Sequence, residues 1–331
     1  MPLPTGANSS SETAISLPGP RLVDMCPVNN TSPADPAPVA KSPPSGWVRP
    51  TLDGVAPTLG TFLHPDGFDR PRVVAVLREG SVVGEAGRHL AWAAGDRRQR
   101  RGTPYASRGA LRGEPVVLVP GFLAGDLSLL PMARALRRRG YRTYRSSINA
   151  NIGCTRVAAA ELEARLESIA HRRGSRVQVV GHSLGGMLAR GLAVRRPDLV
   201  SGIVTLGSPM LAPAAHHASL TASVDVLVRL SRAGVPGLMA EDCVAGTCAR
   251  TSFEESREPV PEAVAFSAVY SRRDGIVDWR ACVDPQAQAV EVRASHVGMA
   301  IDPRVIEAVA AALVRHRDLA SVVEVDRGES A

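Results

Sequence analysis

The stretch VQVVGHSLGGMLARGLA, residues 177–193, passes from strand-like to helix-like sequence around a single serine. Its first four residues include three β-branched valines, which favour a buried strand. Its second half carries apolar residues at helical spacing, at Met187, Leu188, Leu192 and Ala193. The stretch therefore predicts a strand that runs directly into a helix, with a tight turn at Gly-His-Ser-Leu-Gly-Gly between them.

Ser183 lies at the tip of this turn, with Gly181 and Gly185 two positions to either side. Such a turn forces the serine into a strained backbone conformation, and the glycines let the strand and the helix approach closely. The first helical turn offers unpaired N–H groups and the positive end of the helix dipole to a developing oxyanion. This pattern is typical of a nucleophile elbow; the alternative is a glycine-rich turn with a capping serine.

The segments around this stretch alternate between short apolar runs and helical patterns. They predict strands at residues 115–121, 141–148, 177–180, 199–209, 262–271 and 288–293, and helices at residues 127–140, 155–173, 219–234 and 303–317. This alternation predicts an α/β fold, with a mostly parallel sheet flanked by helices on both faces. Residues 210–260 interrupt the alternation and are interpreted as a helical lid insertion.

Composition divides the chain into three regions. Residues 1–60 hold 12 of the 26 prolines, and we expect residues 1–66 to form a disordered tail. Residues 67–112 are expected to form a helical lead-in segment around GEAGRHLAWAA. Residues 113–331 are expected to form the α/β domain, with the lid insertion at about 210–260.

Composition also argues against several classes of function. No apolar run approaches the ~20 residues of a membrane-spanning helix, and the N-terminal stretch does not read as a secretory signal, so we expect a cytoplasmic location. The formal net charge is +7, and the basic residues are almost all arginine. The arginine clusters at 97–101 and 137–139 are interpreted as solvated surface, with peripheral contact to an anionic membrane as the alternative. Nucleic-acid binding is not expected, because aromatic residues are not interleaved with these clusters.

The five cysteines are too few and too scattered for a disulfide framework. Cys243 and Cys248 could bridge the short loop CVAGTC, and the sequence leaves their pairing open. A zinc site that joins them to His216 and His217 fits no zinc spacing template well. We therefore expect neither a metal nor another cofactor.

A neutral serine needs a base to take its proton and an acid to orient that base. Two loops that follow predicted strands carry suitable side chains: YSRRDGIVD supplies Asp274 or Asp278, and RASHVGM supplies His296. Such loops gather at the carboxyl edge of a parallel sheet, and the order Ser, Asp, His accompanies this elbow. We assign Ser183, Asp274 and His296 as the catalytic residues. Asp278 follows an apolar pair that should carry the chain away, so a local cap or ion pair is expected of it.

An oxyanion hole needs two preorganised N–H donors, each worth ~3 kcal/mol to the transition state. The N–H of Leu184, directly after the serine, is one candidate. The second should come from VPGFLAGD, the turn after the first strand, where Phe122 is preferred and Leu123 is the alternative.

The motifs VPGF, VVGHSLGGMLA, TLGSP, YSRRDGIVDW and SHVGM follow one another within about residues 113–318. In this order they resemble the α/β-hydrolase superfamily, specifically its bacterial lipase and esterase branch. The resemblance implies the α/β-hydrolase fold and a triad that acts through an acyl-enzyme, at Ser183, Asp274 and His296. Pro120 departs from the pattern, because many relatives have histidine before the glycine, which leaves the oxyanion geometry open.

Together these features predict a carboxylic ester hydrolase, similar to lipases and esterases, that acts on a small-molecule or lipid ester. Acyl transfer or thioester hydrolysis with the same triad is the first alternative. A noncatalytic binding module that has kept the hydrolase fold is the second. Acyl chain length, the alcohol part of the substrate and the oligomeric state are not predicted by the sequence.

Overall fold

The computed structural model describes residues 59–100 and 113–328. At its centre lies a six-stranded sheet, all of whose neighbouring strands pair in parallel, in the order β2-β1-β3-β4-β5-β6. The strands are β1 (Pro115–Val119), β2 (Arg142–Arg145), β3 (Val177–His182), β4 (Val200–Leu206), β5 (Ala265–Tyr270) and β6 (Gln288–Glu291). Because β1 and β3 are buried along their whole length, they read in the sequence as continuous apolar runs and not as alternating patterns.

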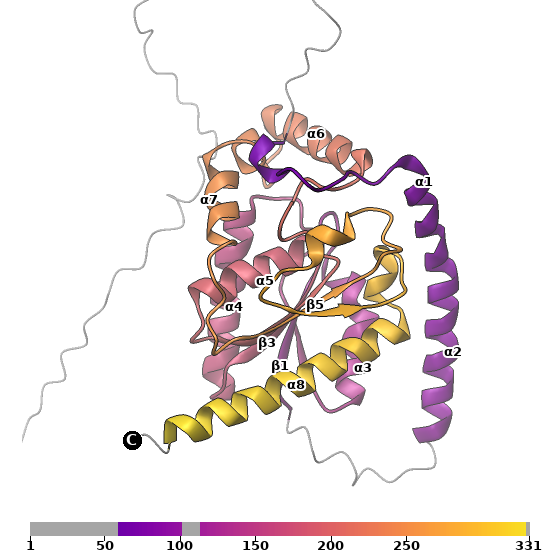
Figure 1. Ribbon diagram of the computed structural model, residues 1–331, viewed down its shortest axis with the longest axis vertical. Coiled ribbons are helices and arrows are strands. Elements are labelled where there is room, and N and C mark those ends of the chain that lie inside the picture. The colour runs from indigo at the N-terminus through magenta and orange to yellow at the C-terminus, as the bar shows by residue number, and fades with distance from the viewer. Residues whose placement is uncertain (1–58, 101–112, 329–331) are drawn as a thin grey trace, which may run out of the picture.

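Helices cover both faces of the sheet (Figure 1). The helices α4 (Thr155–Arg173) and α5 (Leu184–Arg195) pack on one face, and α3 (Leu130–Arg138) and α8 (Pro303–Gly328) pack on the other. In α4 the fully buried residues are Leu162, Leu166 and Ile169, at the spacing that places side chains on one helical face. The expected α/β class, with a mostly parallel sheet flanked by helices, is confirmed.

The insert between β4 and β5 contains three short helical elements above the carboxyl ends of the strands (Figure 1). These elements are α6 (Ala218–Arg232), the 3-10 turn η6 (Glu241–Cys243) and α7 (Thr247–Glu255). Val224 and Val228 of α6 pack against Met239 and Val244 in a separate apolar cluster. The insert therefore has a small core of its own, and it contacts the domain through that core.

Residues 73–100 form an N-terminal arm that runs along one side of the molecule (Figure 1). The arm consists of α1 (Val73–Val76), the 3-10 helix η3 (Leu77–Ser81) and α2 (Val82–Arg100). Trp92 packs against the core on the α3 and α8 side, and the guanidinium groups of Arg138 and Arg139 lie 5.6 and 5.5 Å from its ring centroid. Two arginines of the 137–139 cluster thus have an intramolecular partner. Residues 101–112 of the predicted lead-in lie outside the described residues.

Residues 59–66 differ from the predicted disordered tail. The Gly60 N–H donates to the carbonyl of Val244 at 2.9 Å, and the Ala214 N–H donates to that of Leu63 at 2.8 Å. Phe62 packs against Phe253 of α7, with ring centroids 6.1 Å apart. Composition alone misses this segment, because its few apolar side chains find partners only on the folded insert. Residues 1–58 of the predicted tail lie outside the described residues.

The turn from β3 into α5 is tight. Ser183 has φ 51° and ψ −120°, a left-handed backbone conformation that is rare for residues other than glycine. A Cβ at Gly185 would lie 2.3 Å from the carbonyl oxygen of Val119 and 2.6 Å from that of Pro120. These are backbone atoms of β1 and of the residue after it, which cannot move without displacing the strand. Only glycine at position 185 therefore allows α5 to start directly against the end of β1.

Two glycines of α5 should therefore respond in opposite ways to substitution by alanine. Gly185→Ala should lower the free energy of unfolding by about 3 kcal/mol, because its methyl group overlaps the β1 backbone. Gly191→Ala is the matched control, since a Cβ there meets no heavy atom within 4 Å outside the backbone of its own helix, and it should stabilise the protein by about 0.5–1 kcal/mol. Urea denaturation followed by circular dichroism measures both values. Similar changes for the two variants would contradict this account of the turn.

Candidate active site

Ser183 stands at the carboxyl end of β3, where the elbow presents it to a cavity below the insert. Its N–H donates to the carbonyl of Leu206 at 2.8 Å, which ties the turn to the end of β4. A Cβ at Gly121 would lie 3.0 Å from Ser183 Cβ, so the turn after β1 also approaches the serine closely. The ends of three neighbouring strands thus hold Ser183 in place.

Asp274 and His296 form a buried pair beside the elbow. His296 Nδ1 and Asp274 Oδ2 are 2.7 Å apart, and both side chains are less than a tenth exposed. The other oxygen of Asp274, Oδ1, accepts the N–H groups of Ile276 at 2.9 Å and Val277 at 2.8 Å. With Oδ1 held by the backbone, Oδ2 is left to orient the imidazole ring.

Asp278, the other candidate for the acid, caps a turn and forms an ion pair. Its Oδ1 accepts the N–H of Arg280, which caps the 3-10 turn Trp279–Cys282, and its carboxylate also pairs with the Arg280 guanidinium at 2.9 Å. Its Oδ2 accepts the N–H of Asp69 at 2.9 Å. The structure therefore joins Asp274, and not Asp278, to His296.

His182, which directly precedes Ser183, forms a hydrogen bond with the backbone of His296. Its Nε2 lies 3.0 Å from the carbonyl oxygen of His296, so the ring donates a hydrogen bond from Nε2, and the two imidazole rings are 5.0 Å apart. Within residues 59–100 and 113–328 no hydrogen bond joins the Ser183 hydroxyl to His296. Catalytic hydrogen bonds in enzymes are often long without substrate and tighten only when it is bound.

The two histidines have opposite electrostatic environments. Burial and the neighbouring His296 lower the pKa of His182 to about 4, so its ring is neutral at pH 7. Burial also disfavours the charged form of His296, but the charge and hydrogen bond of Asp274 and the charge of Glu79 outweigh it and raise the pKa of His296. Of these two rings, that of His296 has the surroundings that favour the charged form.

The oxyanion-hole candidates differ in what their N–H groups already bind. The Leu123 N–H donates to the carbonyl of Asn151 at 3.1 Å, which uses up the alternative donor. Among the described residues no acceptor is assigned to the N–H of Phe122, or to that of Leu184 at the start of α5. The carbonyl of Pro120 accepts the Asn151 side-chain amide at 3.0 Å, and that of Ala124 accepts the Asn151 N–H at 2.9 Å. With the Leu123 bond, Asn151 holds this turn at three points.

A cavity of about 180 Å³ opens in front of Ser183. Much of its wall is apolar, and it includes residues of the turn after β1, the elbow and α5, the start of α4, the insert, and the segment 59–63. The residues that carry this wall include Leu63, Phe122, Met187, Val224, Met239 and Phe253. Arg156, Arg195 and Glu255 also line it and give it a charged part. The cavity can therefore accept a group that is largely apolar and joined to a polar end.

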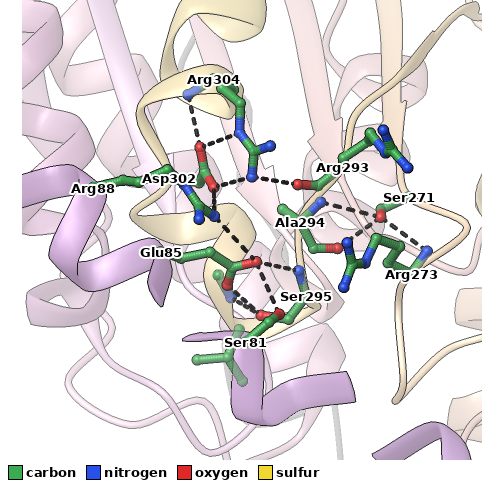
Figure 2. Close-up of polar contacts among 12 residues, drawn as sticks. Ser81, Glu85, Arg88, Ser271, Arg273, Arg293, Ala294, Ser295, Asp302 and Arg304 are labelled. Carbon is green, nitrogen blue, oxygen red and sulfur yellow. Dashed lines mark hydrogen bonds and ion pairs between the residues drawn. The ribbon is translucent and has the colours of Figure 1, made fainter. Parts of the chain in front are cut away.

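Glu79 and Glu85 of the arm were not identified from the sequence, yet both contact the His296 loop. Glu79 accepts the His296 N–H at 2.9 Å, and the fully buried Glu85 accepts the Ser295 N–H at 2.8 Å and its hydroxyl at 2.5 Å. Figure 2 shows Glu85 turned toward Ser295, with Arg88 between it and the buried Asp302. No sequence motif predicts these contacts, because each joins residues more than 200 positions apart.

Three cysteine thiols lie close together, and not only the two of the loop CVAGTC. Cys154, just before α4, brings its Sγ to 3.5 Å from that of Cys248, and the Sγ atoms of Cys154, Cys243 and Cys248 all lie within 4.8 Å of one another. The zinc set considered from the sequence is not assembled, since no histidine joins this group in the part of the chain that the structure describes. His217 instead caps α6 by accepting the Ser219 N–H, and His216 forms a β-bridge with Val277.

Comparison with known proteins agrees with this architecture. Residues 161–232, from within α4 to the end of α6, match the model of a family described as a PGAP1-like alpha/beta domain. Together with the parallel sheet and the strained serine turn, this match confirms the resemblance to the α/β-hydrolase superfamily.

Solved structures with a similar chain path include enzymes of several kinds. The mature lipase BlEst2 of Bacillus licheniformis is 16% identical, with a TM-score of 0.46 over 58% of this chain and 88% of that chain. A metagenomic carboxyl esterase is 18% identical, with a TM-score of 0.47 over 66% and 77%. The thioesterase domain from the curacin biosynthetic pathway is 16% identical, with a TM-score of 0.38 over 62% and 92%.

The Asp274–His296 contact predicts how two aspartate variants will differ. Asp274→Asn should lower the pKa of His296, because the imidazolium loses its charged partner. Asp278→Asn removes a carboxylate that pairs with Arg280 and should leave the His296 titration close to that of the wild type. Titration of the histidine ring signals by NMR measures both. A larger change in Asp278→Asn would show that the acid is misassigned.

Proposed function

We propose that this α/β-hydrolase is a serine hydrolase that cleaves carboxylic esters through an acyl-enzyme. One observation carries the proposal: the buried Asp274–His296 pair lies beside a serine held at positive φ on a strand-to-helix elbow. Each part has a role in that chemistry, since the serine supplies the nucleophile, the histidine the base and the aspartate its orientation. A purely structural turn has no need of such a pair.

The proposed reaction begins when His296 Nε2 takes the proton of the Ser183 hydroxyl as Oγ attacks the ester carbonyl carbon. The carbonyl oxygen becomes an oxyanion, which the N–H groups of Phe122 and Leu184 stabilise. The imidazolium then passes its proton to the leaving alcohol, and Ser183 remains acylated. Water, activated by His296 in the same way, releases the acid and restores the serine. The raised pKa of His296 supports this role, because the charged ring is the form that must appear midway.

The apolar part of the cavity wall supports an acyl ester as substrate. We place the acyl chain between Met187 of α5 and Val224 of α6. In this proposal α6 and α7 act as a lid, because both helices contribute side chains to the cavity wall. A thioester, or an acceptor other than water, would use the same groups, so acyl transfer and thioester hydrolysis remain the alternative reactions. A noncatalytic binding module is the alternative of another class.

The Ser183→Ala variant tests the proposed reaction. It should lower kcat for a soluble p-nitrophenyl ester by ~10⁶-fold, while the melting temperature stays close to that of the wild type. A fluorophosphonate probe should label the wild type at Ser183 and leave the variant unlabelled. A wild-type protein that neither hydrolyses esters nor reacts with the probe would favour the binding module.

The proposed acyl site predicts a dependence on chain length. Val224→Asp places a charge in the cavity wall, and so should lower kcat/KM more for a decanoyl ester than for an acetyl ester. Val226→Asp is the control, because Val226 lies on the same helix and is 52% exposed. A panel of p-nitrophenyl esters of increasing length measures the effect. An equal loss for short and long esters in Val224→Asp would move the acyl chain elsewhere.

A further inference from the structure

We propose that Glu79 of the N-terminal arm is a positioning residue that clamps the Asp274 and His296 loops together. This inference rests on the proposed function, in which both loops carry reacting groups. It adds a residue outside the sheet, the elbow and the insert, on a segment that precedes the α/β domain in the sequence.

The clamp consists of three backbone hydrogen bonds to one carboxylate. Oε1 of Glu79 accepts the N–H of Gly275 and the N–H of His296, each at 2.9 Å. Oε2 accepts the N–H of Val297 at 3.1 Å. Gly275 directly follows Asp274, so a single side chain spans the two loops that present the acid and the base. Breaking it would leave backbone donors from both loops unpaired at once.

The arm approaches the Asp274 loop closely at this point. A Cβ at Gly275 would lie 2.3 Å from the carbonyl oxygen of Ala75 in α1 and 3.1 Å from Glu79 Oε1. Glycine at position 275 therefore allows the arm to contact the backbone itself. The contact fixes where the loop backbone lies, and not merely a side chain on its surface.

Glu85 provides a second anchor one residue before His296. Its carboxylate accepts the N–H and hydroxyl of Ser295 and the hydroxyl of Ser81 at 3.1 Å (Figure 2). A Cβ at Gly298 would lie 1.6 Å from Glu85 Oε2, so the carboxylate fills the space under this loop. Arg88 of the arm pairs with the buried Asp302 at 2.8 Å. With the segment that follows Glu79 fastened in this way, its carboxylate keeps a fixed position.

Glu79 also acts on the charge of His296. The titratable groups close to His296 are Asp274 and His182, which contact its ring, and Glu79, which binds its backbone N–H. Because His182 is neutral at pH 7, the two carboxylates set the electrostatic balance. Both favour the imidazolium and both raise the pKa of His296, although burial opposes them. Glu79 thereby stabilises the charge that proton transfer from Ser183 would create.

The Glu79→Gln variant isolates the effect of charge, because it removes the charge and keeps most of the geometry. Its amide oxygen can still accept the N–H groups of Gly275 and His296. The amide nitrogen cannot accept a hydrogen bond, so the Val297 N–H loses its acceptor. The pKa of His296 should therefore fall, and the acid limb of kcat/KM should move to lower pH, since the neutral base persists further into acid. KM should stay unchanged, because Glu79 does not line the cavity.

Two further variants separate charge from position. Glu79→Ala removes all three hydrogen bonds, so it should lower kcat by up to about 10²-fold in addition to shifting the pKa in the same direction. Glu291→Gln is the matched control, because its exposed carboxylate pairs with Arg272 at 3.4 Å on the strand β6. That control should leave the His296 titration, kcat and KM as in the wild type.

Histidine ring titration and amide hydrogen exchange, both followed by NMR, keep this proposal distinct from the proposed function. Faster exchange of the Gly275 and His296 N–H groups in Glu79→Ala, absent from Glu291→Gln, supports the clamp even if the wild type hydrolyses no ester tested, and a lower His296 pKa in Glu79→Gln supports the charge effect. Wild-type exchange of both N–H groups in Glu79→Ala overturns the clamp, whatever the esterase activity. If Glu79→Ala fails to fold, the Gln variant decides through the Val297 N–H, which loses its acceptor and should exchange faster if the clamp holds.

Discussion

The close crossing of β1, β3 and α5 is the constraint on which the rest of the site depends. Backbone atoms of β1 lie so near the start of α5 that Gly185 has no room for a methyl group, and the chain can turn there only with Ser183 at positive φ. The strain of that conformation is offset by hydrogen bonds such as the one from the Ser183 N–H to β4. Since the turn is fixed by neighbours on both sides, the serine needs no support from its own side chain.

The Asp274–His296 pair depends on a different kind of support, because it lies in loops. Loops contribute few contacts of their own, and a displacement of about 1 Å in a reacting group can cost about 10²-fold in rate. Here the His296 backbone is held from two sides: the His182 ring donates to its carbonyl, and Glu79 accepts its N–H. The sheet thus holds His296 through its carbonyl group, and the N-terminal arm holds it through its N–H group.

The cavity combines parts of the chain that are far apart in the sequence. Its wall includes the elbow, the insert and the short segment at residues 59–63, and that segment forms backbone hydrogen bonds with the insert at Val244 and Ala214. The thiols of Cys154, Cys243 and Cys248 meet where the insert contacts the start of α4. The space in front of Ser183 therefore depends on how the insert and the N-terminal residues pack, and not on the sheet alone.

The sequence by itself determined the parallel α/β architecture, the elbow and the loop positions of the candidate residues. These are local properties: β-branched runs, helical spacing and paired glycines act over a few residues, so they can be read directly from the chain. Even the preference for Asp274 over Asp278 follows from local order, because Asp274 comes directly after its strand.

Only the tertiary structure decided which groups support the site. The bonds from Glu79 to His296, from Glu85 to Ser295 and from Ala214 to Leu63 join residues more than 100 positions apart. A glutamate on a helical arm looks the same in the sequence whether it faces water or a backbone N–H. Its role is set by which surface the folded chain brings opposite to it, and long-range packing alone determines that.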